Sequence, residues 1–553
     1  MYIVSKADSG RRWRRKMKLN REGLKEKNFW PERGIALPGY DVELAAKKAL
    51  AAPRWVHFGI GNIFRVFIGG IADDLLEAGA LDRGLTCVET FDYEVVDKIY
   101  EPYDNLVLSV ILKGDGSREV KALGSLAEAV KADFSCPESR KRMKEIFTSP
   151  VLQLVSFTIT EKGYALYQPD GSYTALTKAD IAKGPQGAVS AIAIVTAGLY
   201  ERFLAGGQPL ALVSMDNCSH NGQLLRSAVL TMAAEWEKAG YVGADFTAWV
   251  SDEDQVAFPW TMIDKITPRP SETLAAEYEA MGIEDMMPVI TAKRTYIAPF
   301  VNAEKPQYLV IEDHFPNGRP QLEKGHGVYM TDRHTVNLAE RMKVTACLNP
   351  VHSALGPLEV VLGIPLFADG LKDPTLLKMA KMVAYGEGMP AIEDPLILSP
   401  KAFTDELFED RFVNEYLGDT NLRLATDVSQ GVGVRFGETI KTYVRRYGSA
   451  EQLVAIPLGI AGWLRYMLGV DDQGNPYELA PDPLNEEMTM RLAEVHFDDP
   501  TSLTDQLVPV LSNENIFFAD LYKAGLGHKI EELFRQMIAG PGSARRTVEK
   551  YMA

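Results

Sequence analysis

Short apolar runs and helical repeats alternate along the first half of the chain. Residues 54–62 form a short apolar stretch that ends in a glycine turn, and residues 63–79 repeat apolar side chains at helical spacing as far as Gly79. A second apolar run, Leu85–Val88, ends at Glu89. This order predicts a strand, a helix and a second strand that together form a βαβ unit.

The same alternation continues to residue 330, where the pattern changes. Further strand candidates lie at 106–112, 152–159, 210–214 and 247–250, with helical stretches between them. This alternation predicts a mostly parallel sheet covered by helices. Beyond residue 330 strand patterns nearly vanish, and helical repeats lie at 336–348, 376–385, 438–447, 450–468, 486–497 and 527–539. We therefore expect an N-terminal extension and lead-in (1–47), a sheet domain (48–332) and an α-helical domain (333–553).

Size and charge narrow the class of protein. The 553 residues exceed one ordinary core, and the 46% hydrophobic and 24% charged residues are typical of a folded, soluble chain. The formal charge of −16 argues against nucleic acid or an anionic membrane as partner, although a local basic pocket can still bind an anionic substrate. No apolar run reaches the ~18–20 residues of a membrane span. Without a long coiled coil or an exposed apolar stretch, we expect a monomer.

Cysteine and histidine usage favours a metal-free chemistry in a reducing compartment. The four cysteines, at positions 87, 136, 218 and 347, are widely spaced and form no Cys-x-x-Cys pair. The eight histidines include no His-Glu-x-x-His spacing. We therefore expect a cytoplasmic protein without a metal site.

The start of the chain is strongly basic and has no apolar segment of the kind found in a secretory signal. Two interpretations remain: an arm that binds nucleic acid or a membrane, or translation that begins at Met17, so that residues 1–16 are an upstream artefact. We favour the second. The basic residues are Arg11, Arg12, Arg14, Arg15, Lys16 and Lys18.

A candidate dinucleotide site follows the first predicted strand. Gly59-Ile-Gly61-Asn62 supplies two of the three glycines of a Rossmann turn, with Arg65 or Val66 where a third small residue is expected. Glycines there let the backbone approach a pyrophosphate, which sits on the N-terminus of the next helix. Glu89, which closes the second strand, could accept hydrogen bonds from the adenosine ribose and repel a 2′-phosphate, favouring NAD over NADP. The alternative for Glu89 is a strand-end carboxylate in a solvated turn.

A second candidate site has the spacing Lys-x5-Asn-x2-His, at Lys343, Asn349 and His352. A buried lysine can act as a base, an amide can donate to an alkoxide or carbonyl oxygen, and a histidine can orient that oxygen. Such a set could interconvert an alcohol and a ketone without a metal, although a lysine and a histidine at this distance are more often ordinary surface and core residues. Because Pro350 disfavours α conformation at Asn349, we expect Lys343 on the last turns of one helix and His352 on the first turn of the next.

In addition to these two sites, several motifs in order resemble the polyol-specific long-chain dehydrogenase family, over most of the chain from Trp55 to Tyr447. They are Gly59-x-Gly61-Asn62, Thr158-Ile-Thr-Glu161-Lys-Gly-Tyr164, Ser214-Met-Asp216-Asn217-Cys-Ser-His-Asn221-Gly, Phe258-Pro-Trp-Thr-Met-Ile-Asp264-Lys-Ile-Thr-Pro268, Ile311-Glu-Asp-His-Phe-Pro-Asn-Gly-Arg319-Pro, Lys343-x5-Asn349-x2-His352 and Arg423-Leu-Ala-Thr-Asp427-Val-Ser-Gln430.

The resemblance implies an α/β fold, with an N-terminal Rossmann-type domain that binds NAD, a mainly α-helical C-terminal domain, and the substrate between them. It implies that Lys343 is the general base, that Asn217 and Asn349 hold the reacting oxygen, and that His352 orients the substrate. It further implies that Asp264 contacts a substrate hydroxyl, that Arg423 contacts the far polar end, and that Glu161 lies on a proton path. The alternatives are a structural turn for Asp264, a surface arginine for Arg423, and an ion pair with Lys162 or a backbone cap for Glu161.

One position departs from the family pattern. Eight residues after Arg423 the family usually carries a lysine, and this chain has Gly431, followed by Gly433 where proline is common. We expect a more flexible loop there and the loss of one positive contact to substrate, for which Arg435 or Lys441 could substitute.

The resemblance is strongest to the branch that interconverts D-mannonate and D-fructuronate with NAD, in hexuronate catabolism. The stretches that indicate this branch are 90–93, 214–221 and 435–441. The alternatives are mannitol 2-dehydrogenase, which acts on mannitol and fructose, and tagaturonate reductase. A more distant alternative is a non-catalytic protein that binds NAD or a sugar acid.

Overall fold

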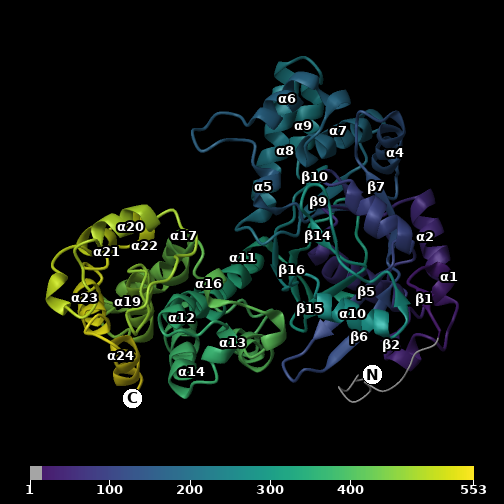
Figure 1. The fold of residues 1–553 in the computed structure, drawn as a ribbon. Coiled ribbons are helices and arrows are strands. Elements are labelled where there is room, and N and C mark those ends of the chain that lie inside the picture. The colour runs from purple at the N-terminus through teal and green to yellow at the C-terminus, as the bar shows by residue number, and fades with distance from the viewer. Residues whose placement is uncertain (1–14) are drawn as a thin grey trace. The chain divides into compact units, whose positions relative to one another are not determined.

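The computed structural model describes residues 15–553, which divide into an N-terminal unit that ends at Asn337 and a C-terminal unit, Leu338–Ala553 (Figure 1). The division falls within helix α11 (Arg333–Met342). Arg11, Arg12 and Arg14 of the basic N-terminal segment lie outside the described residues. The first strand, β1 (Met17–Lys18), pairs in parallel with β12 (Ile283–Glu284).

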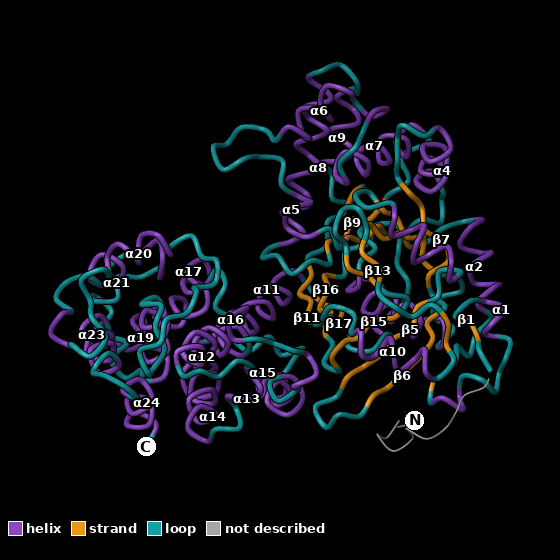
Figure 2. The backbone as a smooth tube through the Cα atoms, in the orientation of Figure 1, coloured by secondary structure: helices purple, strands orange, loops and turns teal. Residues whose placement is uncertain are grey.

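A six-stranded, fully parallel sheet forms the centre of the N-terminal unit (Figure 2). Its strand order is β10-β9-β8-β3-β4-β7. The predicted βαβ unit is confirmed, because β3 and β4 lie side by side in parallel and are joined by a π-helical segment, Phe64–Ile68, and α3 (Gly69–Glu77). The strands are β3 (Trp55–Phe58), β4 (Leu85–Glu89), β7 (Leu126–Lys131), β8 (Leu154–Phe157), β9 (Leu210–Ser214) and β10 (Val256–Ala257).

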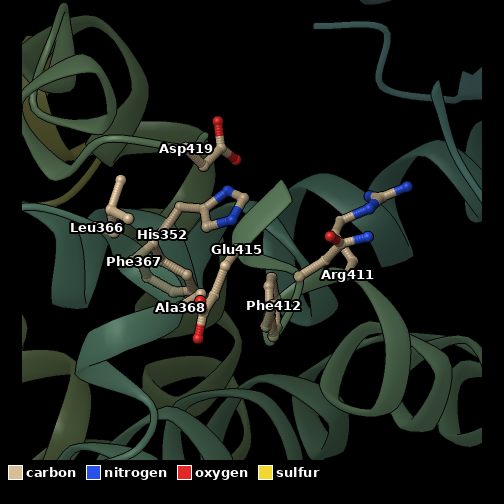
Figure 3. Close-up of a pocket in the computed structure, with 9 residues that line it drawn as sticks. His352, Leu366, Phe367, Ala368, Arg411, Phe412, Glu415 and Asp419 are labelled. Atoms are coloured by element: carbon tan, nitrogen blue, oxygen red, sulfur yellow. The ribbon is translucent and has the colours of Figure 1, made fainter. Parts of the chain in front are cut away.

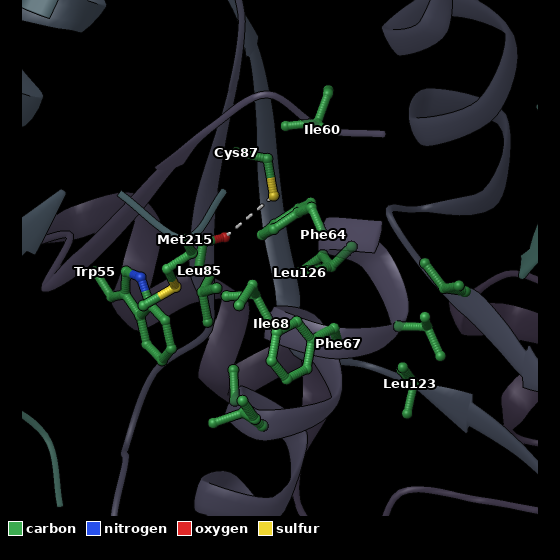
Figure 4. Packing of buried hydrophobic residues seen from close by; sticks show 14 of the residues in the cluster. Trp55, Ile60, Phe64, Phe67, Ile68, Leu85, Cys87, Leu123, Leu126 and Met215 are labelled. Atoms are coloured by element: carbon green, nitrogen blue, oxygen red, sulfur yellow. Dashed lines mark hydrogen bonds between the residues drawn. The ribbon is translucent and has the colours of Figure 1, made fainter. Parts of the chain in front are cut away.

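Alternate residues of these strands enter two different hydrophobic cores, one on each face of the sheet. Trp55 and Leu85 pack with Phe64, Phe67 and Ile68 of the helical crossover on one face (Figure 4). On the other face, the intervening strand residues pack against helices α4, α7 and α8. Burial on both faces explains why the strands read as continuous apolar runs in the sequence. The helices of this unit are α1 (Arg21–Leu24), α2 (Val42–Ala51), α3, α4 (Pro137–Thr148), α5 (Thr160–Tyr164), α6 (Ala175–Lys183), α7 (Ala191–Leu204), α8 (Asn221–Lys238), α9 (Ala244–Ser251) and α10 (Glu272–Ala280).

Two smaller mixed sheets were not expected from the sequence. The predicted strand at 106–112 is present as β5 (Val107–Leu112), but it pairs antiparallel with β6 and not with the parallel sheet. These sheets comprise β15 (Phe300–Glu304), β5, β6 (Arg118–Leu123) and β2 (Ile35–Ala36) in one, and β11 (Thr261–Asp264), β16 (Tyr308–Glu312) and β17 (Val328–Thr331) in the other. A two-stranded ribbon joins β13 (Val289–Ile290) to β14 (Tyr296–Ile297).

The prediction of a strand at 247–250 is wrong, because these residues belong to helix α9. Phe246 and Val250 are the buried residues of this helix, and their spacing of four places both on one helical face. Ser251 Oγ donates to the carbonyl of Thr247 at 2.7 Å, a bond between the same turns. The short β-branched and aromatic run favoured a strand locally, but burial at helical spacing decides the conformation.

The C-terminal unit is helical, and its residues form no strand longer than an isolated bridge. Helix α12 packs closely on α19, because a Cβ on Gly459 would lie only 2.7 Å from the Cβ of Ala354. The helices are α12 (Asn349–Val361), α13 (Phe367–Gly370), α14 (Pro374–Lys381), α15 (Pro400–Glu406), α16 (Asn421–Leu424), α17 (Val428–Val432), α18 (Glu438–Tyr447), α19 (Ala455–Tyr466), α20 (Asn485–Arg491), α21 (Val508–Leu511), α22 (Glu514–Phe517), α23 (Gly527–Met537) and α24 (Ser543–Met552).

Two of these helices are shorter than their sequence patterns predict. The repeat at 450–468 corresponds to α19, which begins only at Ala455. There the buried carboxylate of Glu387 accepts hydrogen bonds from the backbone N–H groups of Val454, Ala455 and Ile456 at 2.6–2.8 Å. A distant carboxylate therefore sets the start of the helix. The repeat at 486–497 corresponds to α20, which ends at Arg491.

None of the helices within residues 15–553 is long and apolar enough to cross a membrane. The four cysteines all lie within residues 15–553 and form no disulfide there, and Cys87 and Cys347 are buried. The same residues contain no cluster of three His, Cys, Asp or Glu side chains that could hold a metal ion.

Candidate active site

The Gly59–Asn62 turn lies at the carboxyl end of β3, the central position for a dinucleotide in such a sheet. Gly59 has φ +88°, and a Cβ there would lie 2.1 Å from the carbonyl oxygen of Thr158. Among residues 15–553, no atom lies within 4 Å of a Cβ placed on Gly61, and Asn62 Oδ1 is buried without a hydrogen-bond partner. Where a third small residue was expected, Arg65 is buried instead and donates to the carbonyl of Ala298 at 2.7 Å. The first two positions fit a pyrophosphate, and the third is used for packing.

A chain of hydrogen bonds beneath this turn holds it in place. Trp55 Nε1–H donates to Ser156 Oγ (2.7 Å), which lies 2.6 Å from His57 Nδ1. His57 Nε2 lies 2.8 Å from Thr158 Oγ1, and that hydroxyl donates to the carbonyl of Gly59 at 2.8 Å. Burial keeps the pKa of His57 well below its usual value, so the ring is neutral. Because the hydroxyl proton of Thr158 is committed to Gly59, His57 must carry its proton on Nε2.

Replacing Gly59 with alanine is expected to destabilise the N-terminal unit by about 1–3 kcal/mol and to weaken NADH binding by at least about tenfold. The added Cβ cannot avoid the backbone carbonyl of Thr158 unless the turn moves. Chemical denaturation and titration of NADH fluorescence measure the two effects. Gly79→Ala is the matched control, since Gly79 also has a positive φ (+64°) but open space around its Cβ position. Equal effects of the two substitutions would show that the close approach at Gly59 is unimportant.

Glu89 ends β4, beside the glycine turn, and is nearly buried. Its Oε1 accepts hydrogen bonds from the backbone N–H groups of Thr90 (3.0 Å), Phe91 (2.7 Å) and Asp92 (3.1 Å). Burial raises the pKa of Glu89, and these N–H groups oppose that shift. The carboxylate therefore organises the loop after β4, and it is not the solvated turn residue of the alternative interpretation.

Three of the sequence motifs in the N-terminal unit are joined by the hydrogen bonds of two side chains, Asp216 and Asn221. The Asp216 carboxylate accepts from the backbone N–H of Ile159 (2.8 Å), that of Thr160 (3.0 Å) and the hydroxyl of Tyr164 (2.7 Å). Asn221 Nδ2 donates to the carbonyl of Asp216 and, in β11, to that of Thr261, both at 3.0 Å. Sequence reasoning did not assign either residue a role, although both stand inside the quoted motifs.

These ties place three predicted site residues on neighbouring segments of the N-terminal unit. Glu161 is exposed on α5, and among the described residues it forms neither the ion pair with Lys162 nor the backbone cap of the alternative interpretation. Asn217 is exposed immediately after Asp216. Asp264 is buried at the end of β11, which Asn221 anchors through Thr261.

In the C-terminal unit, the lysine motif spans a π turn and the start of α12. Lys343 is 2% exposed and begins a π-helical segment, Lys343–Cys347, directly after α11. The expected break between two helices is present at Leu348, but Asn349 is the first residue of α12 and not its cap. A π turn holds one extra residue, which rotates the side chains after it relative to those before it. Asn349 Oδ1 is buried and has no hydrogen-bond partner among residues 15–553.

His352 faces a pocket within the C-terminal unit (Figure 3). The rings of Phe367 and Phe412 pack against its ring at steep angles of 86° and 66°, with centroids 4.9 and 5.2 Å away. Although part of its surface remains exposed, burial lowers the pKa of His352 to about 4. The imidazole is therefore neutral at physiological pH and can both donate and accept a hydrogen bond. The pocket is lined by His352, Leu366, Phe367, Ala368, Arg411, Phe412, Asn414, Glu415 and Asp419.

Arg423 lies next to this pocket on α16 and forms an ion pair with Asp419. Its side chain is 60% exposed. This exposure agrees with the alternative interpretation of Arg423 as a surface arginine. The flexible loop predicted around Gly431 is not present, because residues 428–447 form one helical run with a π turn at Gly433–Gly437. Gly433 is required by packing, since a Cβ there would lie 2.8 Å from the carbonyl oxygen of Ile516.

The fold and these side chains define a two-domain dehydrogenase class, with a dinucleotide-type sheet unit followed by a helical unit that carries a lysine, an asparagine and a histidine. The chain belongs to the mannitol dehydrogenase family of oxidoreductases: residues 53–324 match the mannitol dehydrogenase Rossmann domain, and residues 336–538 match the mannitol dehydrogenase C-terminal domain. The resemblance inferred from the motifs and the predicted fold class are both confirmed.

Individual relatives agree with this assignment. The chain is 48% identical to D-mannonate oxidoreductase of Thermotoga maritima over 97% of its own length and 99% of that protein. Its fold is similar to that of a D-sorbitol dehydrogenase in substrate-free form (TM-score 0.76, 25% identity, 94% of this chain and 98% of that chain). It is also similar to Pseudomonas fluorescens mannitol 2-dehydrogenase in a ternary complex with NAD and D-mannitol (TM-score 0.68, 24% identity, 97% of this chain and 99% of that chain).

Proposed function

We propose that the protein interconverts D-mannonate and D-fructuronate with NAD as cofactor. The observation that carries this proposal is the 48% identity to a D-mannonate oxidoreductase over nearly the whole of both chains. The buried lysine of the Lys-x5-Asn-x2-His motif is consistent with proton transfer at a carbonyl or carbinol group, and the amide oxygen of Asn349, which has no partner among residues 15–553, can accept a hydrogen bond from a substrate hydroxyl. Mannitol 2-dehydrogenase and tagaturonate reductase remain the alternative activities.

We propose that residues 48–332, within the N-terminal unit, form the NAD-binding domain. This domain would bind NAD through Gly59, Gly61, Asn62 and Glu89. The open space at Gly61 fits a pyrophosphate at the start of the helix, and the buried Oδ1 of Asn62 can accept a hydrogen bond from a hydroxyl group of the cofactor. The buried carboxylate of Glu89 would disfavour a 2′-phosphate and so favour NAD over NADP. When bound, NAD would supply hydride acceptance and donation.

We propose the following roles for the residues that act on the substrate. Lys343 removes the hydroxyl proton when mannonate is oxidised and returns it during reduction, while Glu161 lies on the path of that proton to solvent. The amides of Asn217 and Asn349 stabilise the oxygen as its charge changes. His352, neutral at physiological pH, orients the substrate with Asp264 and Arg423.

The partners proposed for the protein are small molecules alone. The net charge of −16 supports the absence of a nucleic-acid or membrane partner, and the four cysteines, which form no disulfide within residues 15–553, are consistent with a reducing cytoplasm. We further propose that the protein acts as a monomer, which light scattering of the purified chain measures directly.

A substrate screen that follows NADH absorbance tests the proposed activity. With D-fructuronate, kcat/KM is expected to exceed that with D-fructose by at least about 100-fold, because a site built for a carboxylate leaves its charge unpaired when a polyol ketone binds. D-Tagaturonate tests the remaining family activity. Faster reduction of fructose or tagaturonate would assign the protein to another branch. NADH binding without turnover of any of the three would favour a non-catalytic binding protein.

A further inference from the structure

Arg435 occupies the space in which a side chain at position 431 would lie. Both residues belong to the helical run at 428–447, four positions apart, so Arg435 leans back over the turn that contains Gly431. A Cβ on Gly431 would come within 2.7 Å of both Cζ and Nε of Arg435. The absence of a side chain at Gly431 therefore allows the guanidinium to lie directly against the helix backbone.

The guanidinium of Arg435 reaches the first turns of α12, close enough to His352 to act on its charge. Its Nη1 donates to Ser353 Oγ at 2.7 Å, and Ser353 follows His352 on α12. Ser353 is fully buried, so this bond fixes the arginine beside the histidine that faces the pocket. Burial lowers the pKa of Arg435, and the arginine in turn contributes to the lowered pKa of His352.

Within residues 15–553, no carboxylate forms an ion pair with Arg435. Arg423 and Lys441 differ from it in this respect. Arg423 pairs with Asp419, and Lys441 donates to Glu438 at 2.7 Å while its side chain is 47% exposed. A guanidinium has five N–H donors, and a neutral serine hydroxyl satisfies only one of them here. A partly buried positive charge without an anionic partner is costly unless a ligand supplies the anion.

We propose that Arg435 binds the carboxylate of the sugar-acid substrate and thereby selects aldonates and uronates over polyols and neutral ketoses. The planar guanidinium matches a carboxylate in a two-bond arrangement that a lysine cannot reproduce. The proposal rests on the proposed function and adds the residue that determines the substrate class. It also accounts for Gly431, because a lysine there would displace the arginine.

Replacing Arg435 with glutamine tests the proposal, since the change removes the charge and leaves a shorter, neutral polar side chain. The KM for D-fructuronate is expected to rise by about 10- to 100-fold, whereas the KM for D-fructose changes by less than about threefold. Gly431→Ala is a second variant that leaves the arginine in the chain but pushes its guanidinium away, and a smaller rise in the same KM is expected. Lys441→Gln is the matched control and should leave both constants unchanged.

Calorimetric titration with D-mannonate separates this proposal from the proposed function. If the parent protein binds D-mannonate but fails to turn over D-fructuronate, loss of that binding in Arg435→Gln would still support the carboxylate site. An unchanged KM and affinity in Arg435→Gln would overturn it. An equal loss with D-fructose, together with a lowered thermal transition, would also overturn it, by showing a purely structural role. If the parent binds no D-mannonate at all, both proposals fail.

Discussion

Replacing Lys343 with alanine is expected to lower kcat by about 10²–10⁴-fold in both directions, with little effect on NADH affinity. The side chain is 2% exposed at the start of a π turn, so neighbouring water has little access to replace it as a base. The loss should appear mainly in kcat, because proton transfer takes place in the transition state and not in the ground-state complex. Stopped-flow and steady-state kinetics with D-fructuronate and D-mannonate measure the effect.

The pH dependence of the same variant gives a second test of this role. In the parent enzyme, oxidation of D-mannonate requires an unprotonated base, so kcat should increase with pH, and this dependence should disappear in Lys343→Ala. A small primary amine added to the variant should restore part of the rate. Lys378→Ala is the control, since Lys378 is an exposed lysine of the same unit on α14. Substantial turnover by Lys343→Ala at neutral pH would remove this lysine from the mechanism.

The parallel-sheet half of the fold could be predicted because its determinants are local. The apolar run 55–58 and the run 85–89 each feed alternate residues into two cores, and the glycines between them require a turn that few other residues allow. The helix at 438–447 has the bounds of its sequence pattern for the same reason. The strand predicted at 247–250 failed, because tertiary burial of Phe246 and Val250 at helical spacing overrode a β-type local composition.

The detailed geometry of the candidate site depends on contacts between residues distant in sequence, and could not be predicted. The π turn at 343–347 packs on a second π segment, Met382–Gly388, where a Cβ on Gly388 would lie 3.0 Å from Ala346. Glu387 of the same segment caps α19, more than sixty residues later in the chain. Neither arrangement has a local sequence pattern. The position of Arg435 also depends on a contact distant in sequence, its hydrogen bond to Ser353. From the sequence alone, Gly431 indicated only the loss of a positive contact to the substrate.

Asn349 combines a predicted catalytic role with an unfavourable local environment. Its Oδ1 is buried without a partner in the described part of the chain, an arrangement that costs stability by about 1–3 kcal/mol. A buried polar group that the protein itself does not satisfy is characteristic of a site prepared for a ligand. Stability and activity should therefore respond to its removal in opposite directions, unlike the response of a purely structural asparagine.

Replacing Asn349 with alanine is expected to lower kcat by about 10²–10³-fold, because one of the two amides proposed to stabilise the reacting oxygen is lost. The thermal transition should stay unchanged or rise, since the buried acceptor is removed with it. Asn421→Ala is the matched comparison: its Oδ1 is likewise buried without a partner in the described part of the chain, but its Nδ2 donates to Glu359 Oε2 at 2.7 Å and to the carbonyl of Ile364 at 2.9 Å, so its removal should lower the transition. Steady-state kinetics and calorimetry of the two variants measure these effects. A fall in stability without a change in kcat for Asn349→Ala would show that Asn349 supports the start of α12 and does not contact the substrate.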